Sequence, residues 1–179
     1  MSQLGPPVVL RASPKRLISR DFVFGTGDAL SRCADREETA MFRRILVPMD
    51  LSARNARPLT LALALARSGR ATVTLMHVVR QVPGLTAGEM RDFYDRLVKT
   101  SRSRLERAAR PFAAKGIVVR TQVWVGDPAS EIVRTASASH ADLIVMGSHR
   151  VNPKRRGMGW GTTSYKVGIL CRCPILLVK

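Results

Sequence analysis

The chain has 179 residues, of which 45% are hydrophobic and 24% are charged, and this is enough for one globular domain with its own core. No apolar stretch approaches the ~20 residues that cross a bilayer, and no apolar signal core opens the chain, so we expect a cytoplasmic protein without a membrane partner. Thirty Lys and Arg against 13 Asp and Glu give a net charge of +17, and the three cysteines, Cys33, Cys171 and Cys173, match neither a disulfide framework nor a zinc pattern.

Residues 1–40 are predicted to form a mostly irregular tail. Gly-Pro-Pro at residues 5–7 and Gly-Thr-Gly at residues 25–27 interrupt the segment, and no helical or strand period persists in it. Met41 stands immediately before the first strong strand pattern, so we expect the domain to occupy residues 41–179. Whether the first 40 residues are native, or Met41 is the natural start, stays open from the sequence.

From residue 45 onward, strand and helix patterns alternate along the chain. Apolar runs predict strands at residues 45–48, 71–79, 117–125, 143–146 and 175–178. Helical periodicity predicts helices at residues 55–68, 86–115, 128–139 and 162–170.

The ends of the predicted helices carry recognisable capping residues. Asn55 is favoured over Ser52 as the first cap, because Pro58 then lies in the first turn, where its missing N–H is harmless. Gly69 and Gly116 are expected to end the first two helices. Asp127-Pro128 is expected to begin the third helix, with the aspartate as cap and the proline at the first helical position.

The alternation predicts an α/β fold, namely a doubly wound open parallel sheet with helices on both faces. The predicted strands are continuous apolar runs, which is typical of strands covered on both sides. Right-handed crossovers join such strands in sequence. Ligands of these sheets lie beyond the carboxyl ends of the strands, where the winding reverses. Residues 48–50 and 147–149, which follow the first and fourth strands, are therefore the candidate binding segments.

The segment Met146–Ser164 combines glycines, hydroxyls and basic residues. Gly147 would let the backbone turn sharply off a buried strand and approach a ligand closely. Gly161-Thr162-Thr163 would open a helix whose free N–H groups suit a phosphate, and the planar guanidinium of Arg150 suits phosphate oxygens. Asp50 could accept hydrogen bonds from a ribose or a base. The alternatives are plain turn geometry for the glycines and a turn-capping role for Asp50.

Five segments resemble the universal stress protein family and occur in the family's order: RRILVPMD, TLMHVV, VGDPASEIV, ADLIVMGSH and CPILLVK. The resemblance covers essentially all of residues 41–179. It implies a Rossmann-like sheet of five parallel strands in the order 3-2-1-4-5, with a switch point between the first and fourth strands. It also implies a homodimer through the last strand, whose residues Ile175, Leu176, Leu177 and Val178 would otherwise form an exposed apolar edge.

One branch of this family binds ATP and carries Gly-x-x-Gly, nine residues, and then Gly-Ser/Thr. Gly147 fits the first glycine, Arg150 replaces the second, and ten residues instead of nine separate Arg150 from Gly161-Thr162. The resemblance implies an adenine-nucleotide site with ATP as its ligand, and Mg²⁺ only together with bound nucleotide. The residues that it assigns to the site are Pro48, Asp50, Val78, Met146, Gly147, Arg150, Gly161, Thr162 and Thr163.

The sequence contains no motif of a dedicated enzyme. It has no P-loop, no nucleophile elbow and no metal-spaced set of His, Cys and Asp, so any ATP hydrolysis is expected to be slow and incidental. Two functions remain: a stress-response or signalling protein that binds adenine nucleotide, and a family member that has lost this binding and acts through protein or nucleic-acid contacts. The second function rests on Arg150, on the altered spacing, and on the net charge of +16 in residues 41–179. The alternative explanation of this charge is that the arginines lie on helix faces and are merely solvated.

Overall fold

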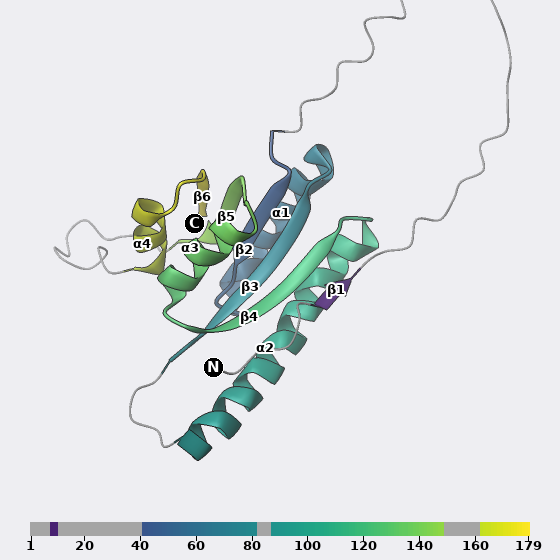
Figure 1. The fold of residues 1–179 in the computed structure, drawn as a ribbon. Helices are drawn as coiled ribbons and strands as arrows, with labels where there is room; N and C mark the ends of the chain where they lie inside the picture. The colour runs from purple at the N-terminus through teal and green to yellow at the C-terminus, as the bar shows by residue number, and fades with distance from the viewer. Residues whose placement is uncertain (1–7, 11–40, 82–86, 149–161) are drawn as a thin grey trace, which may run out of the picture.

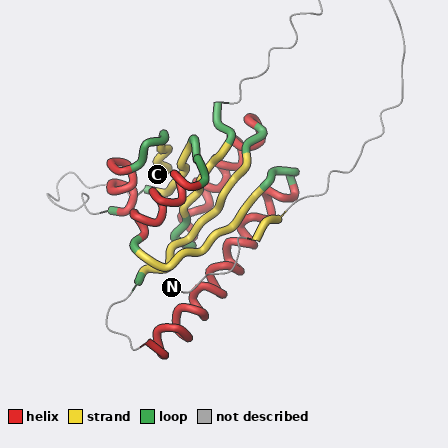
Figure 2. Tube along the Cα trace, viewed as in Figure 1, coloured by secondary structure: helices red, strands yellow, loops and turns green. Residues whose placement is uncertain are grey.

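One twisted sheet runs through the molecule, and helices cover both of its faces (Figure 1). The structure is a computed structural model that describes residues 8–10, 41–81, 87–148 and 162–179. The strands are β1 (Val8–Leu10), β2 (Arg44–Pro48), β3 (Thr72–Arg80), β4 (Val119–Gly126), β5 (Leu143–Gly147) and β6 (Ile175–Val178). The helices are the 3-10 helix η2 (Ala53–Asn55) and the α-helices α1 (Ala56–Gly69), α2 (Ala87–Ala114), α3 (Pro128–Ala138) and α4 (Thr163–Leu170). Figure 2 shows how helix and strand alternate.

The order of the strands in the sheet is β1-β4-β3-β2-β5-β6. Each neighbouring pair among the strands from β2 to β6 is parallel. When these five strands are numbered by themselves along the chain, their order is 3-2-1-4-5, so the predicted doubly wound sheet is confirmed. The winding reverses between β2 and β5, because the chain first builds outward from β2 to β4 and then returns to the other side of β2.

The strand β1 adds a sixth member to the sheet, which the sequence did not predict. It pairs antiparallel with β4, with Val8 opposite Thr121 and Leu10 opposite Val119. Because an open sheet edge exposes unpaired backbone groups, this short strand covers part of the edge that β4 would otherwise present. The remainder of the predicted tail lies outside the described residues.

The two faces of the sheet explain why its strands are apolar at successive positions. In β2, Ile45 and Val47 pack into a cluster with residues of α1 and α2, whereas Leu46 packs into a second cluster with residues of α3 and α4. Successive side chains of a strand point to opposite faces, so a strand covered twice needs apolar residues on both. The core is therefore two layers, one on each side of the sheet.

Most predicted helix ends are confirmed, but the start of α1 differs. Asp127 caps α3 by accepting a hydrogen bond from the Ser130 amide at 3.0 Å, and Gly116 after α2 has a φ of 74°. Asn55 makes no side-chain capping bond to α1; Ser52 caps η2 instead, accepting from the Arg54 amide. Asn55 occupies the N-cap position of α1, as predicted, but its side chain does not cap the helix because it holds the 3-10 turn that comes before α1.

The long helix α2 divides into a covered half and a projecting half. Figure 1 shows its amino-terminal half extending past the end of the sheet. Phe93 and Leu97 of that half are exposed, whereas Leu105, Ala109 and Phe112 of the other half are buried. Among the described helices, none combines the length and the apolar composition that crossing a membrane would require.

Candidate functional site

A cavity of about 640 Å³ lies at the carboxyl ends of β2, β3 and β5. This is the crevice where the winding of the sheet reverses, because β3 and β5 flank β2 on opposite sides. Small-molecule sites in proteins have volumes of about 300–1,000 Å³, so the cavity has room for a ligand of nucleotide size. The place that the strand pattern predicted for a ligand is thus hollow in the folded protein.

The candidate site residues that the structure describes all line this one cavity. They come from the ends of β2, β3 and β5 and from the start of α4, so residues up to 115 positions apart in sequence converge. These residues are Pro48, Asp50, Val78, Met146, Gly147, Thr162 and Thr163. Arg150 and Gly161, which were also assigned to the site, lie outside the described residues.

Asp50 lines the cavity and also holds the turn that follows β2. Its Oδ1 accepts hydrogen bonds from the Ser52 amide at 2.9 Å and from the Ser52 hydroxyl at 2.7 Å. The side-chain amide of Asn55 donates to the same oxygen. Arg54 lies 3.4 Å from the other oxygen, Oδ2. The turn-capping role that the sequence left open as an alternative is therefore present.

The network around Asp50 changes its ionisation and supports an unusual backbone. Partial burial raises the pKa of Asp50, but the hydrogen bonds from Ser52 and Asn55 and the charge of Arg54 outweigh it, so the pKa lies below its usual value. The carboxylate is anionic at neutral pH. Leu51, the next residue, has a φ of 59°, a conformation that costs free energy for a residue with a side chain. The bonds to Asp50 span this residue and keep the turn in place.

Gly147 is not required by the geometry of its turn. Among the described glycines only Gly116 has a positive φ, so Gly147 adopts a conformation open to other residues. A Cβ at Gly147 would meet only the Pro58 ring, at the ordinary contact distance of 3.8 Å. Both residues line the cavity. A larger side chain at residue 147 would therefore occupy space in the cavity, and the absence of a side chain keeps that space open.

The helix α4 begins at the cavity wall with a cluster of hydroxyls. Thr162 caps the helix, and its Oγ1 accepts a hydrogen bond from the Tyr165 amide at 3.3 Å. The Ser164 hydroxyl lies 3.4 Å from the hydroxyls of both Thr162 and Ser148. The first N–H groups of a helix have no partners within the helix, and they form its positive end. Donors and a positive dipole end therefore face the cavity together.

Four basic side chains at the cavity were missed by the sequence reasoning. They are Arg54, Arg57, Arg80 and Lys179. Arg57 donates to the backbone carbonyl of Lys179 at 2.6 Å, which ties the start of α1 to the end of the chain. Arg80 is the last residue of β3, and Asp50 follows the end of β2. The rule that ligands lie beyond the carboxyl ends of the strands could therefore have identified Arg80 as well. Arg57 and Lys179 are 122 residues apart, and no local pattern joins them.

His77 is a further lining residue, and it has a structural partner. Its Nδ1 lies 2.7 Å from the carbonyl oxygen of Met49, so the ring links β3 to the segment that follows β2. His77 therefore helps to hold the segment after β2 against β3.

Among the residues that the structure describes, the charged groups at the cavity do not form a metal site by themselves. Asp50 is the only acidic residue among those that line it in the described part of the chain. Nowhere among the described residues do three His, Cys, Asp or Glu side chains gather closely enough to hold a metal ion. Since Mg²⁺ prefers six oxygen ligands, most of them would have to come from a bound phosphate and water.

Comparisons with known proteins agree in fold and in family. Residues 41–179 match the universal stress protein family. Universal stress protein YxiE of Bacillus subtilis is 31% identical over 149 residues, covering 78% of this chain and all of that protein. The structure of universal stress protein UspA from Lactobacillus plantarum aligns with a TM-score of 0.66 at 22% identity, over 76% of this chain and 97% of that one. A universal stress protein from Archaeoglobus fulgidus in complex with dAMP aligns with a TM-score of 0.51 at 19% identity, over 78% of this chain and 99% of that one. The chain belongs to the universal stress protein family.

Proposed function

We propose that this protein is a stress-response or signalling protein that binds an adenine nucleotide, with ATP as the expected ligand, in the cavity beside β2 and β5. One observation carries the proposal: seven residues chosen for this role from the sequence line a single cavity of suitable volume. A member of the same family with the same fold holds dAMP, which supports an adenine nucleotide as the class of ligand.

The cavity offers different surroundings to the two ends of a nucleotide. Met76, Val78, Ile132 and Met146 supply an apolar wall, which suits the faces of an adenine ring. The basic side chains named above supply charge for phosphates, whose oxygens form strong hydrogen bonds with Arg and Lys. Asp50 is anionic, and its Oδ2 keeps capacity to accept a bond from a ribose hydroxyl.

The start of α4 is the expected place for a phosphate. The first N–H groups of the helix and the hydroxyls of Thr162 and Ser164 can donate to it, whereas the Tyr165 amide already donates to Oγ1 of Thr162. The helix dipole adds partial positive charge. Gly147 leaves room for the ligand beside this helix end. The sequence carries no motif of a dedicated ATPase, and we infer that any ATP hydrolysis is slow and incidental.

The direct test is calorimetric titration of the full chain with ATP, with GTP as the comparison base. We expect binding in the micromolar range for ATP and at least tenfold weaker binding for GTP. Gly147→Leu should weaken ATP binding at least tenfold, about 1.4 kcal/mol, because the added side chain occupies the cavity. Gly168→Leu is the matched control, since Gly168 lies on α4 with no atom within 4 Å of its absent Cβ.

Comparison of the wild-type protein with the variant Arg150→Gly distinguishes the two functions that the sequence leaves open. If wild type and Arg150→Gly both bind ATP, the arginine is tolerated or helpful in the site. If Arg150→Gly alone binds, Arg150 closes the site in the native protein and the nucleotide-binding proposal fails for it. Absence of binding by both variants would reject the proposal outright.

A second candidate function, contact with nucleic acid, is favoured by the charge on α2 and the turn after it. Residues 99–115 carry six basic side chains and a single acidic one, Glu106. The six are Lys99, Arg102, Arg104, Arg107, Arg110 and Lys115, and none forms an ion pair with a described carboxylate. Six cations along α2 and the turn after it, without ion-pair partners among the described carboxylates, attract a polyanion.

Salt dependence distinguishes a polyanion on α2 from a nucleotide in the cavity. Binding of a polymer through many phosphates releases counterions and weakens steeply with salt. The double variant Arg107→Gln, Arg110→Gln should weaken binding of a labelled RNA oligonucleotide and leave ATP binding unchanged.

The expected assembly is a homodimer through β6, and the expected location is the cytoplasm; both are inferred from the family and the composition.

A further inference from the structure

The side chains of Cys171 and Cys173 are in contact, with 3.4 Å between their Sγ atoms. Both are free thiols and half-buried. Residues two apart in an extended chain point to the same side but stay separated, whereas the chain here bends at Arg172 and Cys173 between α4 and β6. The bend brings the two thiols into contact.

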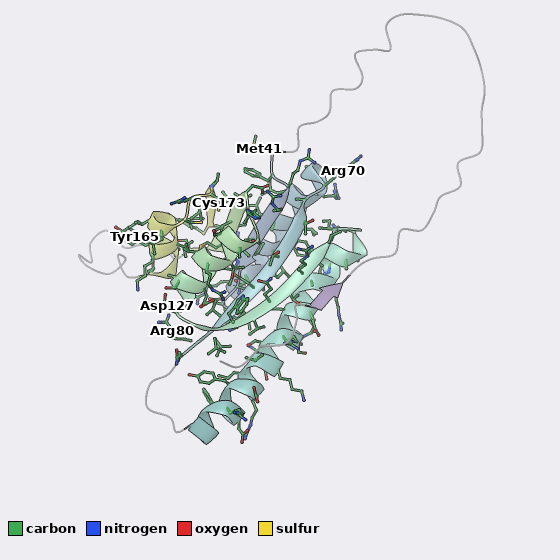
Figure 3. All side chains as sticks on the ribbon, viewed as in Figure 1. Met41, Arg70, Arg80, Asp127, Tyr165 and Cys173 are labelled. Carbon is green, nitrogen blue, oxygen red and sulfur yellow. The ribbon has the colours of Figure 1, made fainter. Side chains whose placement is uncertain are left out.

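A second cavity, of about 500 Å³, makes the thiol pair reachable from outside. Arg44, His140, Arg172 and both cysteines are among the residues that line it. Figure 3 shows Cys173 at the end of the sheet opposite Arg80 and Asp127, so this cavity is separate from the candidate nucleotide site. Asp142 also lines this cavity, so its two arginines leave one net positive charge, which suits small anionic reactants.

We propose that Cys171 and Cys173 form a redox-active dithiol, which is oxidised to an internal disulfide by exchange with a small anionic disulfide such as oxidised glutathione. In the first step the Cys171 thiolate attacks one sulfur of the reagent, forming a mixed disulfide and releasing one glutathione thiolate. In the second step Cys173 loses its proton and attacks Sγ of Cys171, forming the internal bond and releasing the second glutathione. The protein loses two electrons and two protons, and one oxidised glutathione becomes two reduced molecules.

The electrostatics of the pair fit this division of roles. Burial, the hydrogen bond with Cys171 and the charge of Cys171 raise the pKa of Cys173 to about 12. Cys173 therefore keeps its proton during the first step, in which Cys171 is the attacking residue. Once Cys171 enters a mixed disulfide, its charge is gone and one cause of the raised pKa disappears. Cys173 then loses its proton more readily than it does beside a charged Cys171.

The length of the enclosed loop makes the bond a reversible one. A bridge across a single residue removes little conformational entropy from the unfolded chain, so it contributes little to stability. Small strained bridges are also the ones most readily reduced. The two cysteines lie between the end of α4 and the start of β6. Thr163 at the start of α4 and Val178 at the end of β6 line the first cavity. Its oxidation state is thus positioned to affect both elements.

The experiment uses the full chain with the substitution Cys33→Ser, which leaves Cys171 and Cys173 as its two cysteines. The reduced protein is equilibrated with mixtures of oxidised and reduced glutathione, quenched in acid, alkylated with N-ethylmaleimide and weighed by intact-protein mass spectrometry. We expect two labels before oxidation, none after it and no retained glutathione, with full reversal in excess reduced glutathione. The further variant Cys173→Ser should stop at a glutathione adduct on Cys171.

A measurement on the wild-type chain locates the bond without any substitution. Trypsin cleaves after Lys166 and Arg172, so a bridge between the cysteines must link the peptides Val167–Arg172 and Cys173–Lys179. Recovery of this linked pair from oxidised protein, and of two separate peptides after reduction, supports the proposal. Persistent glutathione adducts on both cysteines, or disulfide-linked dimers instead of the internal bridge, overturn it.

Discussion

The side-chain amide of Asn55 donates a hydrogen bond to Oδ1 of Asp50, so the acid at the candidate site is also the anchor of the turn before α1. Asn55 is 6% exposed, and its amide also donates to the Ser52 carbonyl at 2.9 Å. The position of the Asp50 carboxylate in the cavity therefore depends on Asn55, a buried residue that belongs to no binding motif. Function and local stability are joined in this turn.

The first prediction follows from that bond. Asn55→Ala should destabilise the protein by about 1–2 kcal/mol, because a buried donor to a carboxylate is lost while Asp50 stays partly hydrated. It should also weaken ATP binding severalfold, since Asp50 loses its orientation. Urea unfolding and calorimetry measure the two effects. Thr60→Ala is the control and should change neither by much, because it removes only the bond from the exposed Thr60 hydroxyl to the Ala56 carbonyl on α1.

The second prediction concerns acid. Because the pKa of Asp50 is lower in the folded protein than its usual 3.8, its stabilising contribution is complete above pH 3.8 and is lost as the pH falls through the lowered folded-state value. The difference in free energy of unfolding between wild type and Asp50→Asn should therefore be constant from pH 7 to about pH 5 and shrink below pH 3.8. Asp127, whose pKa is lowered by hydrogen bonds from Ser130, titrates in both proteins and cancels in this difference. A difference that stays unchanged down to pH 2.5 contradicts the assignment.

The third prediction tests the start of α4. Thr162→Ala removes the oxygen that accepts from the Tyr165 amide and should cost about 1 kcal/mol of stability. Thr162→Ser keeps a capping hydroxyl and should retain nearly all of it, which makes it the conservative control. If the helix end also holds a phosphate, the alanine variant loses ATP affinity and the serine variant keeps it. Equal affinities for both variants would place the phosphate elsewhere.

The fourth prediction concerns the expected dimer. Leu176 packs against the core, so a charge there would disturb folding as well as association. Leu177 is 43% exposed and is the better position to test the edge of β6. Leu177→Lys should give a monomer in light scattering with its circular dichroism unchanged. Leu97→Lys, on the exposed half of α2, is the matched control and should leave the assembly of the wild-type protein intact; a dimer that survives Leu177→Lys would remove β6 from the interface.

The sequence predicted the fold well because the signals for this architecture are local. Each parallel strand is a short apolar run, and Asp127, Pro128 and Gly116 mark helix ends through their own backbone preferences. At the start of α1 the predicted N-cap residue is in place, but the use of its side chain was not predicted. Ser52 and Asn55 can both cap a helix, and the contact with Asp50, five residues earlier, decides that the Asn55 side chain serves the turn.

The residues that follow the strands were predictable, whereas the basic rim of the cavity was not. Pro48, Asp50 and Gly147 could be chosen from the sequence because the topology of a doubly wound sheet brings the ends of its strands together. The meeting of Arg57 with the last residue of the chain, and the contact between the two thiols, depend on how α1, α4 and β6 pack and bend. Sequence alone determined the alternation of elements and the end of the sheet where a ligand would lie, because both follow from short-range patterns and chain connectivity. Tertiary structure decided which charges and thiols face one another. Side chains that are distant in sequence meet only when the elements pack, and side chains close in sequence meet only when the chain bends between them.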